Sequence, residues 1–218
     1  MSSKKAYPLH YLERLPKTGS TSRHPVIILL HGRAAKAETI FSIEGLFDPS
    51  FHIIAIQAPY SSEKGDFEWF LPYDYERPLE SFSEQQFRES ETILTEQIQA
   101  MMIERSVTAD RLFIGGFSQG AAMSHIISLR GNISVRGVLA MSGFFPRPLL
   151  YWKLPEIRSS YFISHGTNDK VLSISESKFA YDFYTEHHID AEFFEYNGRH
   201  KMTISLLQKI NDWIRTKY

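Results

Sequence analysis

The chain has 218 residues, of which 43% are hydrophobic and 22% are charged, and its formal net charge is −1. This composition is typical of an ordinary soluble globular protein, and the small net charge provides no global field to hold nucleic acid or an anionic membrane. The absence of cysteine excludes disulfides, thiolate nucleophiles and cysteine-based zinc sites.

Targeting and linker signals are sparse. Residues 1–15 contain no apolar core of the kind that a signal peptide needs. The densest apolar run, residues 26–30, is too short to span a bilayer. There is no internal repeat and no Pro- or Gly-rich linker. We therefore expect one domain, residues 1–218, in the cytoplasm and without membrane insertion.

Short apolar runs recur along the chain and predict strands. Residues 6–15 indicate a weakly apolar strand that ends at Pro16, and the polar stretch 17–24 then turns back toward Val26, which suggests an edge hairpin. The later runs are rich in Val, Ile and Phe, with little alternation of apolar and polar residues. This pattern is typical of strands buried on both faces. These runs are 26–30, 52–56, 112–116, 135–141, 160–164 and 191–196.

Helical patterns lie between these runs. Ser81 with Glu84, and Ser173 with Glu176, each have the spacing of a capping box that opens a helix. Apolar residues then recur at helical spacing along one face of each predicted helix. The faces are Phe87, Leu94, Ile98 and Met101/Met102; Ala180, Phe183 and Tyr184; and, near the C-terminus, Leu206/Leu207, Ile210 and Trp213/Ile214. Strands that alternate with helices predict an α/β fold with a parallel sheet covered on both faces.

The segment "LFIGGFSQGAAM" places Ser118 between a predicted strand and a predicted helix. Its core, Gly116 to Gly120, has the pattern G-x-S-x-G of a nucleophile elbow. Glycine fits here because a sharp strand-to-helix turn brings backbone segments too close for a side chain. The turn would hold the hydroxyl over the start of the following helix, whose N–H groups favour negative charge. Chance occurrence is the alternative, since the pattern alone is loose.

A serine nucleophile needs a base and an orienting acid, which follow it in the order acid, then histidine, in this arrangement. Asp169 and His200 each lie just past the end of a predicted strand, where ligands bind in open parallel sheets. We predict Asp169 as the acid and His200 as the base. The competing residues fit turns, helix ends or helix faces better: His125, His165, His187, His188, Asp182 and Asp190.

An oxyanion hole needs two backbone N–H groups. We expect one from Gln119, which follows the serine, and one from Arg33, in the loop after the strand 26–30. Gly32 would let this loop pass close to the site. A plain turn is the alternative interpretation of His31-Gly32, and the Arg33 side chain could meet an acidic group on a substrate.

Aromatic residues predict a substrate pocket. Residues 58–78 form a long aromatic segment without helical period, and such segments in compact domains are usually binding loops. The predicted lining residues are Trp69, Phe70, Tyr73, Phe144 and Phe145. An equally good interpretation is that these side chains cover the core. Between Met141 and Tyr161 there is no room for a helical cap, so we expect an open cleft.

These segments together resemble the phospholipase/carboxylesterase family of α/β-hydrolases, which includes the acyl-protein thioesterases. The resemblance runs from Val26 to the C-terminus and is carried, in the family's order, by "ILLHGRAAKAE", "IIAIQAPY", "ADRLFIGGFSQGAAMS", "VLAMSGFFP", "SHGTNDKVL" and "YNGRHKM". It implies an α/β-hydrolase fold, with a mostly parallel central sheet flanked by helices on both faces. It also implies a Ser118, Asp169 and His200 triad that needs no metal or cofactor. The thioesterase branch usually has further glycine and aspartate after His-Gly, whereas "HGR" here looks more like bacterial esterases.

The predicted function is hydrolysis of a small-molecule carboxylic ester through an acyl-enzyme. Thioesterase, lysophospholipase or transacylase activity with the same triad is the first alternative. A non-catalytic binding protein on a hydrolase scaffold is the second. Nucleic acid is not an expected partner, and either a monomer or a homodimer is compatible with the sequence.

Overall fold

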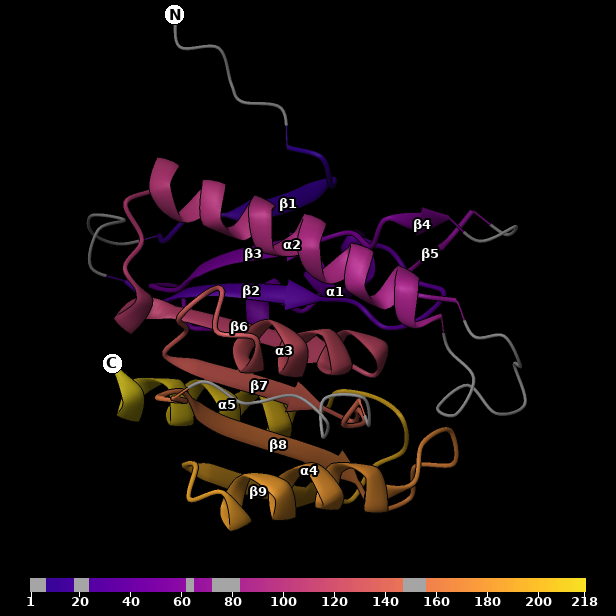
Figure 1. Cartoon of the computed structure of the whole chain (residues 1–218). Helices are drawn as coiled ribbons and strands as arrows, with labels where there is room; N and C mark the ends of the chain where they lie inside the picture. Colours follow the sequence, from indigo (N-terminus) through magenta and orange to yellow (C-terminus); the bar gives the residue numbers. More distant parts are fainter. Residues whose placement is uncertain (1–6, 18–23, 62–64, 72–82, 147–155) are drawn as a thin grey trace, which may run out of the picture.

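The computed structural model describes residues 7–17, 24–61, 65–71, 83–146 and 156–218. A seven-stranded sheet in the order β1-β3-β2-β6-β7-β8-β9 forms the centre of the molecule (Figure 1). Its strands are β1 (Tyr11–Arg14), β2 (Val26–Leu30), β3 (His52–Ile56), β6 (Leu112–Phe117), β7 (Gly137–Met141), β8 (Ser160–Gly166) and β9 (Ala191–Tyr196). Neighbouring strands run parallel from β3 to β9, whereas β1 runs antiparallel to β3. The predicted, mostly parallel sheet is confirmed.

The six apolar runs are all strands of this sheet. β2, β3, β7 and β8 are buried along their whole lengths, as predicted, and this includes the polar residues His52 of β3 and Ser160, Ser164 and His165 of β8. β9 differs because it is an edge strand that pairs only with β8, and most of its residues are partly buried. The prediction of burial on both faces therefore holds for the central strands and is wrong for this edge.

The predicted hairpin between the first two strands is wrong. β1 pairs with β3, with Tyr11 opposite Ile56 and Arg14 opposite Ile53. β2 has no free edge for it, because β3 and β6 occupy its two sides. A less apolar strand suits the sheet edge that β1 occupies, where only one side needs a partner.

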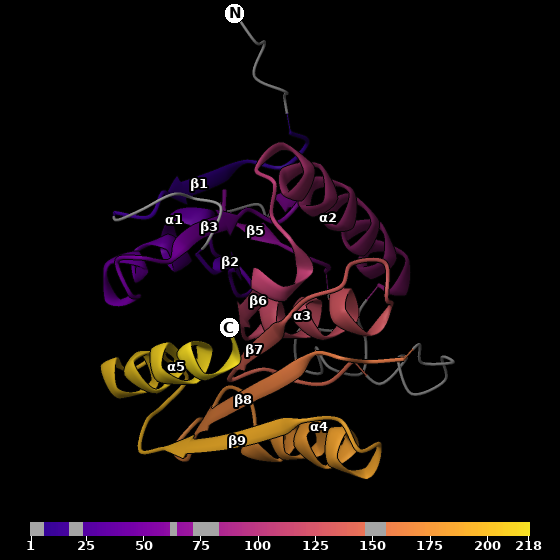
Figure 2. The ribbon, with the colours of Figure 1, turned by 90° about the vertical axis from the view of Figure 1, so that its left-hand side faces the viewer.

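Helices cover both faces of the sheet, as predicted (Figure 2). One face carries α2 (Glu84–Glu104), α3 (Gln119–Leu129) and α4 (Ile174–Glu186). The opposite face carries α1 (Ala37–Phe41) and α5 (Ile204–Lys217). The short helix α1 has no counterpart in the sequence analysis, because five residues give too little periodicity to detect.

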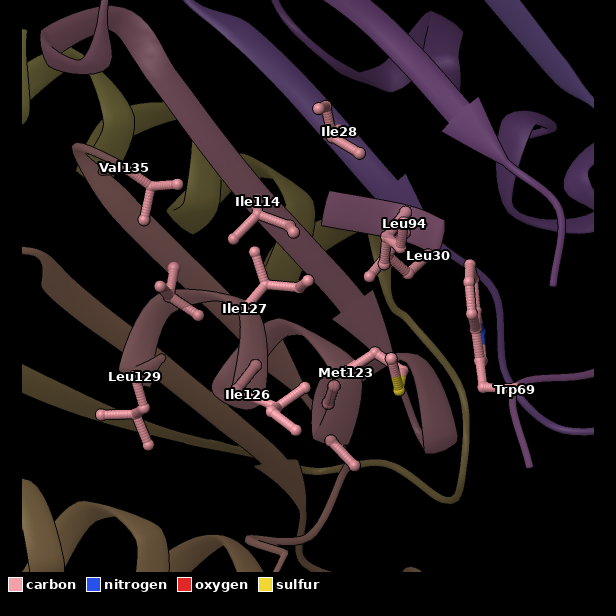
Figure 3. Close-up of a cluster of buried hydrophobic side chains, with 14 of the residues drawn as sticks. Ile28, Leu30, Trp69, Leu94, Ile114, Met123, Ile126, Ile127, Leu129 and Val135 are labelled. Atoms are coloured by element: carbon pink, nitrogen blue, oxygen red, sulfur yellow. The ribbon is translucent and has the colours of Figure 1, made fainter. Parts of the chain in front are cut away.

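Alternate residues of the central strands pack into two separate hydrophobic cores, one on each face of the sheet. Ile28 and Leu30 of β2 point into a cluster with α2 and α3, which Figure 3 shows with Ile114 and Met123. Ile27 and Leu29 join a second cluster with α1 and α5. Because successive side chains of a strand point to opposite faces, a strand between two helical layers needs apolar residues throughout.

The caps of two helices test the predicted starts. Ser83, not Ser81, is the N-cap of α2, and its hydroxyl accepts a hydrogen bond from the Gln86 backbone N–H. The prediction at Ser81 is wrong by two residues. Ser173 is the N-cap of α4, as predicted, and accepts from the Ser175 backbone N–H.

Two negative findings hold for the described part of the chain. Its helices include none long and apolar enough to cross a membrane. No group of three or more His, Cys, Asp or Glu side chains within it could hold a metal ion.

Candidate active site

Ser118 lies at a sharp turn between β6 and α3, where the sequence analysis places it. Its backbone has φ 56° and ψ −115°, a region that residues other than glycine rarely adopt. Two backbone hydrogen bonds hold the turn: Ser118 N–H donates to the Met141 carbonyl at 2.9 Å, and Ala121 N–H donates to the Ser118 carbonyl at 3.0 Å. The fold therefore supports a strained serine, which is the usual state of a nucleophile elbow.

The glycines around Ser118 are required by close backbone contacts. A Cβ at Gly116 would lie 2.0 Å from the Gly120 carbonyl oxygen, and a Cβ at Gly120 would lie 2.2 Å from the Leu30 carbonyl oxygen. A Cβ at Gly32 would lie 3.3 Å from Ser118 Cβ. At Gly116 and Gly120 the atoms met belong to the backbone and cannot move aside as a flexible side chain could, so the predicted crowding there is confirmed. At Gly32 the two nearest atoms are side-chain carbons of Ser118 and Phe117, a tight contact that agrees with a loop passing close to the site.

A short hydrogen bond joins the side chains of Asp169 and His200. His200 Nδ1 donates to Asp169 Oδ2 at 2.6 Å. The Asp169 side chain is fully buried and that of His200 is 17% exposed. Burial alone would raise the pKa of Asp169, but hydrogen bonds from Leu172 N–H, His200 and Val171 N–H outweigh it and lower this pKa below its ordinary value. The carboxylate is therefore held ionised against one nitrogen of the imidazole.

The loop that carries His200 is fixed to the loop that carries Asp169. Asn168 N–H donates to the Gly198 carbonyl at 2.9 Å, and Thr167 N–H donates to the Tyr196 carbonyl at 2.9 Å. Within the segment of His200, Tyr196 O–H donates to the Lys201 carbonyl at 2.8 Å. A Cβ at Gly166 would lie 2.5 Å from the Gly198 carbonyl oxygen, so the two loops pack backbone to backbone. This packing explains how two residues distant in the sequence keep one geometry.

Ser118 and His200 line the same cavity, which has a volume of about 380 Å³. The Phe117 ring, beside the serine, lies 4.7 Å from the His200 ring between centroids. The other lining residues are His31, Gly32, Arg33, Ala35, Thr39, Ile40, Ser42, Ile43, Lys201 and Met202. The structure thus brings Ser118 and His200 to one cavity and places Asp169 against the far nitrogen of the imidazole.

The cavity wall includes residues that the sequence analysis did not find. Ile40 and Ile43 come from α1 and its C-terminal turn, which gave no periodic signal. Lys201 and Met202 directly follow His200, and this adjacency was the available signal. Together they give the cavity an apolar side and a cationic rim.

The two candidate oxyanion donors lie at the positions expected. Gln119 is the first residue of α3, where backbone N–H groups have no partner within the helix. Arg33 is exposed and lines the cavity, and Ala34, next to it, has φ 51°. Their function as donors stays a prediction.

His31 anchors the loop that carries Arg33. Its Nε2 accepts a hydrogen bond from Ala58 N–H at 2.9 Å, which leaves Nδ1 to donate to the Gly32 carbonyl at 2.7 Å. Burial lowers the pKa of His31, in keeping with a neutral ring. His31-Gly32 is therefore more than a plain turn, because both ring nitrogens of His31 form hydrogen bonds with the backbone.

The predicted aromatic pocket lies in the core instead. Trp69, Phe70, Phe144 and Phe145 are all buried in the cluster between the sheet and the helices α2 to α4, and none of them lines the cavity beside Ser118 (Figure 3 shows Trp69). Tyr73 lies outside the described residues. The second interpretation, that these aromatics cover the core, describes the four that can be placed, because apolar rings gain more from close packing than from lining a wet cleft.

The competing histidines have structural partners. His165 is fully buried, with Nδ1 hydrogen-bonded to the Ser177 hydroxyl and Nε2 to the Leu172 carbonyl. His187 Nδ1 contacts the Phe183 carbonyl at the end of α4, as predicted for a helix C-terminus. His125 is buried inside α3, hydrogen-bonded to the Tyr184 hydroxyl at 2.7 Å.

The buried His125 predicts a pH dependence of stability. Burial lowers its pKa to about 3 in the folded protein, whereas an unfolded histidine has a pKa of about 6.5. Below about pH 6.5 the unfolded state binds the extra proton, so this residue lowers the free energy of unfolding by up to about 1.4 kcal/mol per pH unit as the pH falls. We expect His125→Gln to lose stability less steeply than the wild type between pH 6.5 and 4.5 in urea denaturation; equal slopes would contradict this assignment.

Comparison with known proteins places this geometry in context. The model of the phospholipase/carboxylesterase family matches residues 17–218. An acyl-protein thioesterase 1 from Debaryomyces hansenii is 31% identical over 122 residues, which cover 53% of this chain and 51% of the relative. The chain thus spans about half the length of this curated relative.

Solved structures share the fold at low sequence identity. Esterase PE8 has a TM-score of 0.86 at 20% identity and covers 96% of this chain and 99% of its own. A carboxylesterase from Bacillus cereus has a TM-score of 0.83 at 18% identity and covers 96% of this chain and 95% of its own. These likenesses confirm the α/β-hydrolase fold, and the described residues add no large cap to it.

Proposed function

Because the chain belongs to the phospholipase/carboxylesterase family, we propose that it is a serine hydrolase that cleaves carboxylic esters through Ser118, His200 and Asp169. One observation carries this proposal above the others. The Asp169–His200 hydrogen bond of 2.6 Å ends at a cavity that Ser118 also lines, at the turn of a nucleophile elbow. A base oriented by a buried acid next to a strained serine is the arrangement of acyl-transfer catalysis.

The proposed first step is attack by Ser118 Oγ on the ester carbonyl. Because Nδ1–H is engaged by Asp169, the other imidazole nitrogen is left to accept the serine proton. The new Oγ–C bond gives a tetrahedral intermediate, and its collapse breaks the bond to the leaving alcohol, which takes the proton from His200. Water then repeats both steps on the acyl-enzyme and releases the acid.

Asp169 supports the charge that appears on His200 in each step. Its carboxylate is fully buried and accepts two backbone N–H bonds through Oδ1, while Oδ2 lies 2.6 Å from His200 Nδ1 and 3.3 Å from Nε2 of the buried His165. The lowered pKa of Asp169 keeps it ionised while His200 becomes positive. The backbone N–H groups of Gln119 and Arg33 are proposed to stabilise the oxyanion.

The cavity favours a small ester. Its volume of about 380 Å³ lies near the lower end of the roughly 300–1,000 Å³ usual for ligand pockets. Ile40, Ile43 and Met202 offer an apolar wall for an acyl or alcohol group. A sequence relative is named a thioesterase and a structural neighbour a carboxylesterase. Thioester cleavage, lysophospholipid cleavage and transacylation with the same triad are the alternatives. A cytoplasmic location remains a prediction of the sequence.

Labelling by a fluorophosphonate tests the proposal directly. We expect the wild-type protein to react at one site, and peptide mapping to place the adduct on Ser118, because only an activated serine displaces fluoride from phosphorus at a useful rate. Heat-denatured protein is the control and should not label. A folded protein that fails to label would favour the non-catalytic binding protein instead.

A further inference from the structure

Residues Phe67–Phe70, called here the bridging segment, contact both elements that carry the predicted oxyanion donors, the loop of Arg33 and the start of α3. On one side the segment pairs with the loop of Arg33. Phe67 N–H donates to the Ala35 carbonyl at 2.9 Å, and Ala35 N–H donates to the Phe67 carbonyl at 3.3 Å. The indole N–H of Trp69 donates to the His31 carbonyl at 2.9 Å. Arg33 therefore lies between two residues that are both bonded to this segment.

On its other side the bridging segment is held by the Gln119 side chain. Gln119 Oε1 accepts from Trp69 N–H at 2.8 Å, and Gln119 Nε2 donates to the Phe70 carbonyl at 2.7 Å. Gln119 is 4% exposed and Trp69 is fully buried. All four polar groups of this clamp are thus satisfied within the protein, away from water.

We propose that the Gln119 side chain and the Trp69 indole are positioning residues that set the distance between the two oxyanion donors. The Gln119 backbone N–H starts α3 and the Arg33 backbone N–H belongs to the β2–α1 loop, so the two donors come from different elements. The hydrogen bonds of the bridging segment connect these elements across the site. This inference rests on the proposed hydrolase function.

Placement matters because an oxyanion hole acts only at short range. Its donors must lie about 2.7–3.1 Å from the oxygen that develops charge, and removal of one donor costs about 10²–10³-fold in kcat. A displacement of about 1 Å at a reacting centre can cost about 10²-fold. Loss of the hydrogen bonds that hold the bridging segment would therefore slow the chemical step. The cavity that binds the substrate in its ground state would change little.

Another glutamine of the chain offers a matched control. Gln97 in α2 is 1% exposed and makes the same clamp on the Leu9 backbone: its Oε1 accepts from Leu9 N–H at 2.8 Å, and its Nε2 donates to the Leu9 carbonyl at 3.0 Å. Leu9 precedes the edge strand β1, and neither residue lines the cavity. Replacement of either glutamine by methionine removes two equivalent buried hydrogen bonds.

The test compares Gln119→Met with Gln97→Met in the full chain. We expect both to lower the midpoint of thermal unfolding by similar amounts. We expect only Gln119→Met to lower kcat for a p-nitrophenyl ester, by about 10- to 100-fold with little change in KM. A trifluoromethyl ketone, whose serine adduct mimics the tetrahedral intermediate, should lose affinity for Gln119→Met by the same factor and should bind Gln97→Met as it binds the wild type.

Three outcomes would overturn the inference: wild-type kcat and ketone affinity in folded Gln119→Met, an equal loss of both in Gln97→Met, or a loss confined to KM. Should Gln119→Met not fold, Trp69→Phe removes the indole donor to the His31 carbonyl, together with part of the buried ring, and keeps the backbone groups that Gln119 binds. It should still lower kcat and ketone affinity together, and an unchanged kcat there also overturns the inference. Fluorophosphonate labelling of the wild type separates the two proposals. No labelling rejects the hydrolase itself, whereas normal labelling with an unaffected Gln119→Met rejects only the positioning role.

Discussion

Ser118→Ala is expected to lower kcat for ester hydrolysis by about 10⁶-fold, the loss seen when a triad serine is removed elsewhere. The substitution deletes the oxygen that would form the acyl-enzyme, and no neighbouring hydroxyl in the cavity is held at such a turn. Ser118 is half-buried and has φ 56°, so alanine inherits the same backbone strain without gaining a clash. Hydrolysis of a p-nitrophenyl ester by the purified variant, followed by absorbance, measures the loss.

Ser106→Ala controls for alanine at positive φ. Ser106 has φ 51° and is exposed in the turn after α2, away from the cavity. We expect this variant to keep wild-type kcat and KM. Ser118→Ala with more than about a hundredth of wild-type activity would contradict the nucleophile assignment, since removal of any triad member elsewhere leaves far less.

The strands of the sheet were predictable because each carries its own signal. The runs 26–30 and 52–56 coincide with β2 and β3, since a strand between two helical layers needs apolar side chains on both faces. The run 191–196 coincides with the edge strand β9, where most residues are only partly buried. Pairing carries no such local signal. β1 joins β3 and not β2 because β6 already occupies the other side of β2, and this depends on residues almost ninety positions away in the sequence.

Some residues of the candidate site also have a local sequence signal, whereas others are placed only by tertiary packing. The positions of Ser118, Asp169 and His200 follow from a turn motif and from strand ends, which are local features of the sequence. The cavity wall is not local. Ile40 reaches it from a helix too short to leave a period, whereas Trp69, chosen for its aromatic character, is buried in the core. Composition shows that a side chain is apolar; which apolar surface it covers is decided by tertiary packing.

Asp169→Asn is expected to lower kcat by about 10⁴-fold while the protein stays folded. Asparagine keeps the shape of the side chain, and its Oδ1 can still accept from Val171 N–H and Leu172 N–H. It loses the charge, and its amide N–H₂ would face His200 Nδ1, which now donates to Oδ2 at 2.6 Å. The imidazole would then carry its proton on the nitrogen that must act as the base.

Asp190→Asn is the control for this change, because Asp190 is an exposed carboxylate whose Oδ2 accepts short bonds from the Ser160 hydroxyl and from Lys217 Nζ, both at 2.6 Å. Loss of that carboxylate should leave kcat within a few fold of the wild type. Comparison of the two variants therefore distinguishes two roles of a carboxylate. Asp169 is expected to support the catalytic base, whereas Asp190 only connects two secondary-structure elements. If steady-state assays give both variants the same kcat, Asp169 has no part in catalysis and His200 would need another source of orientation.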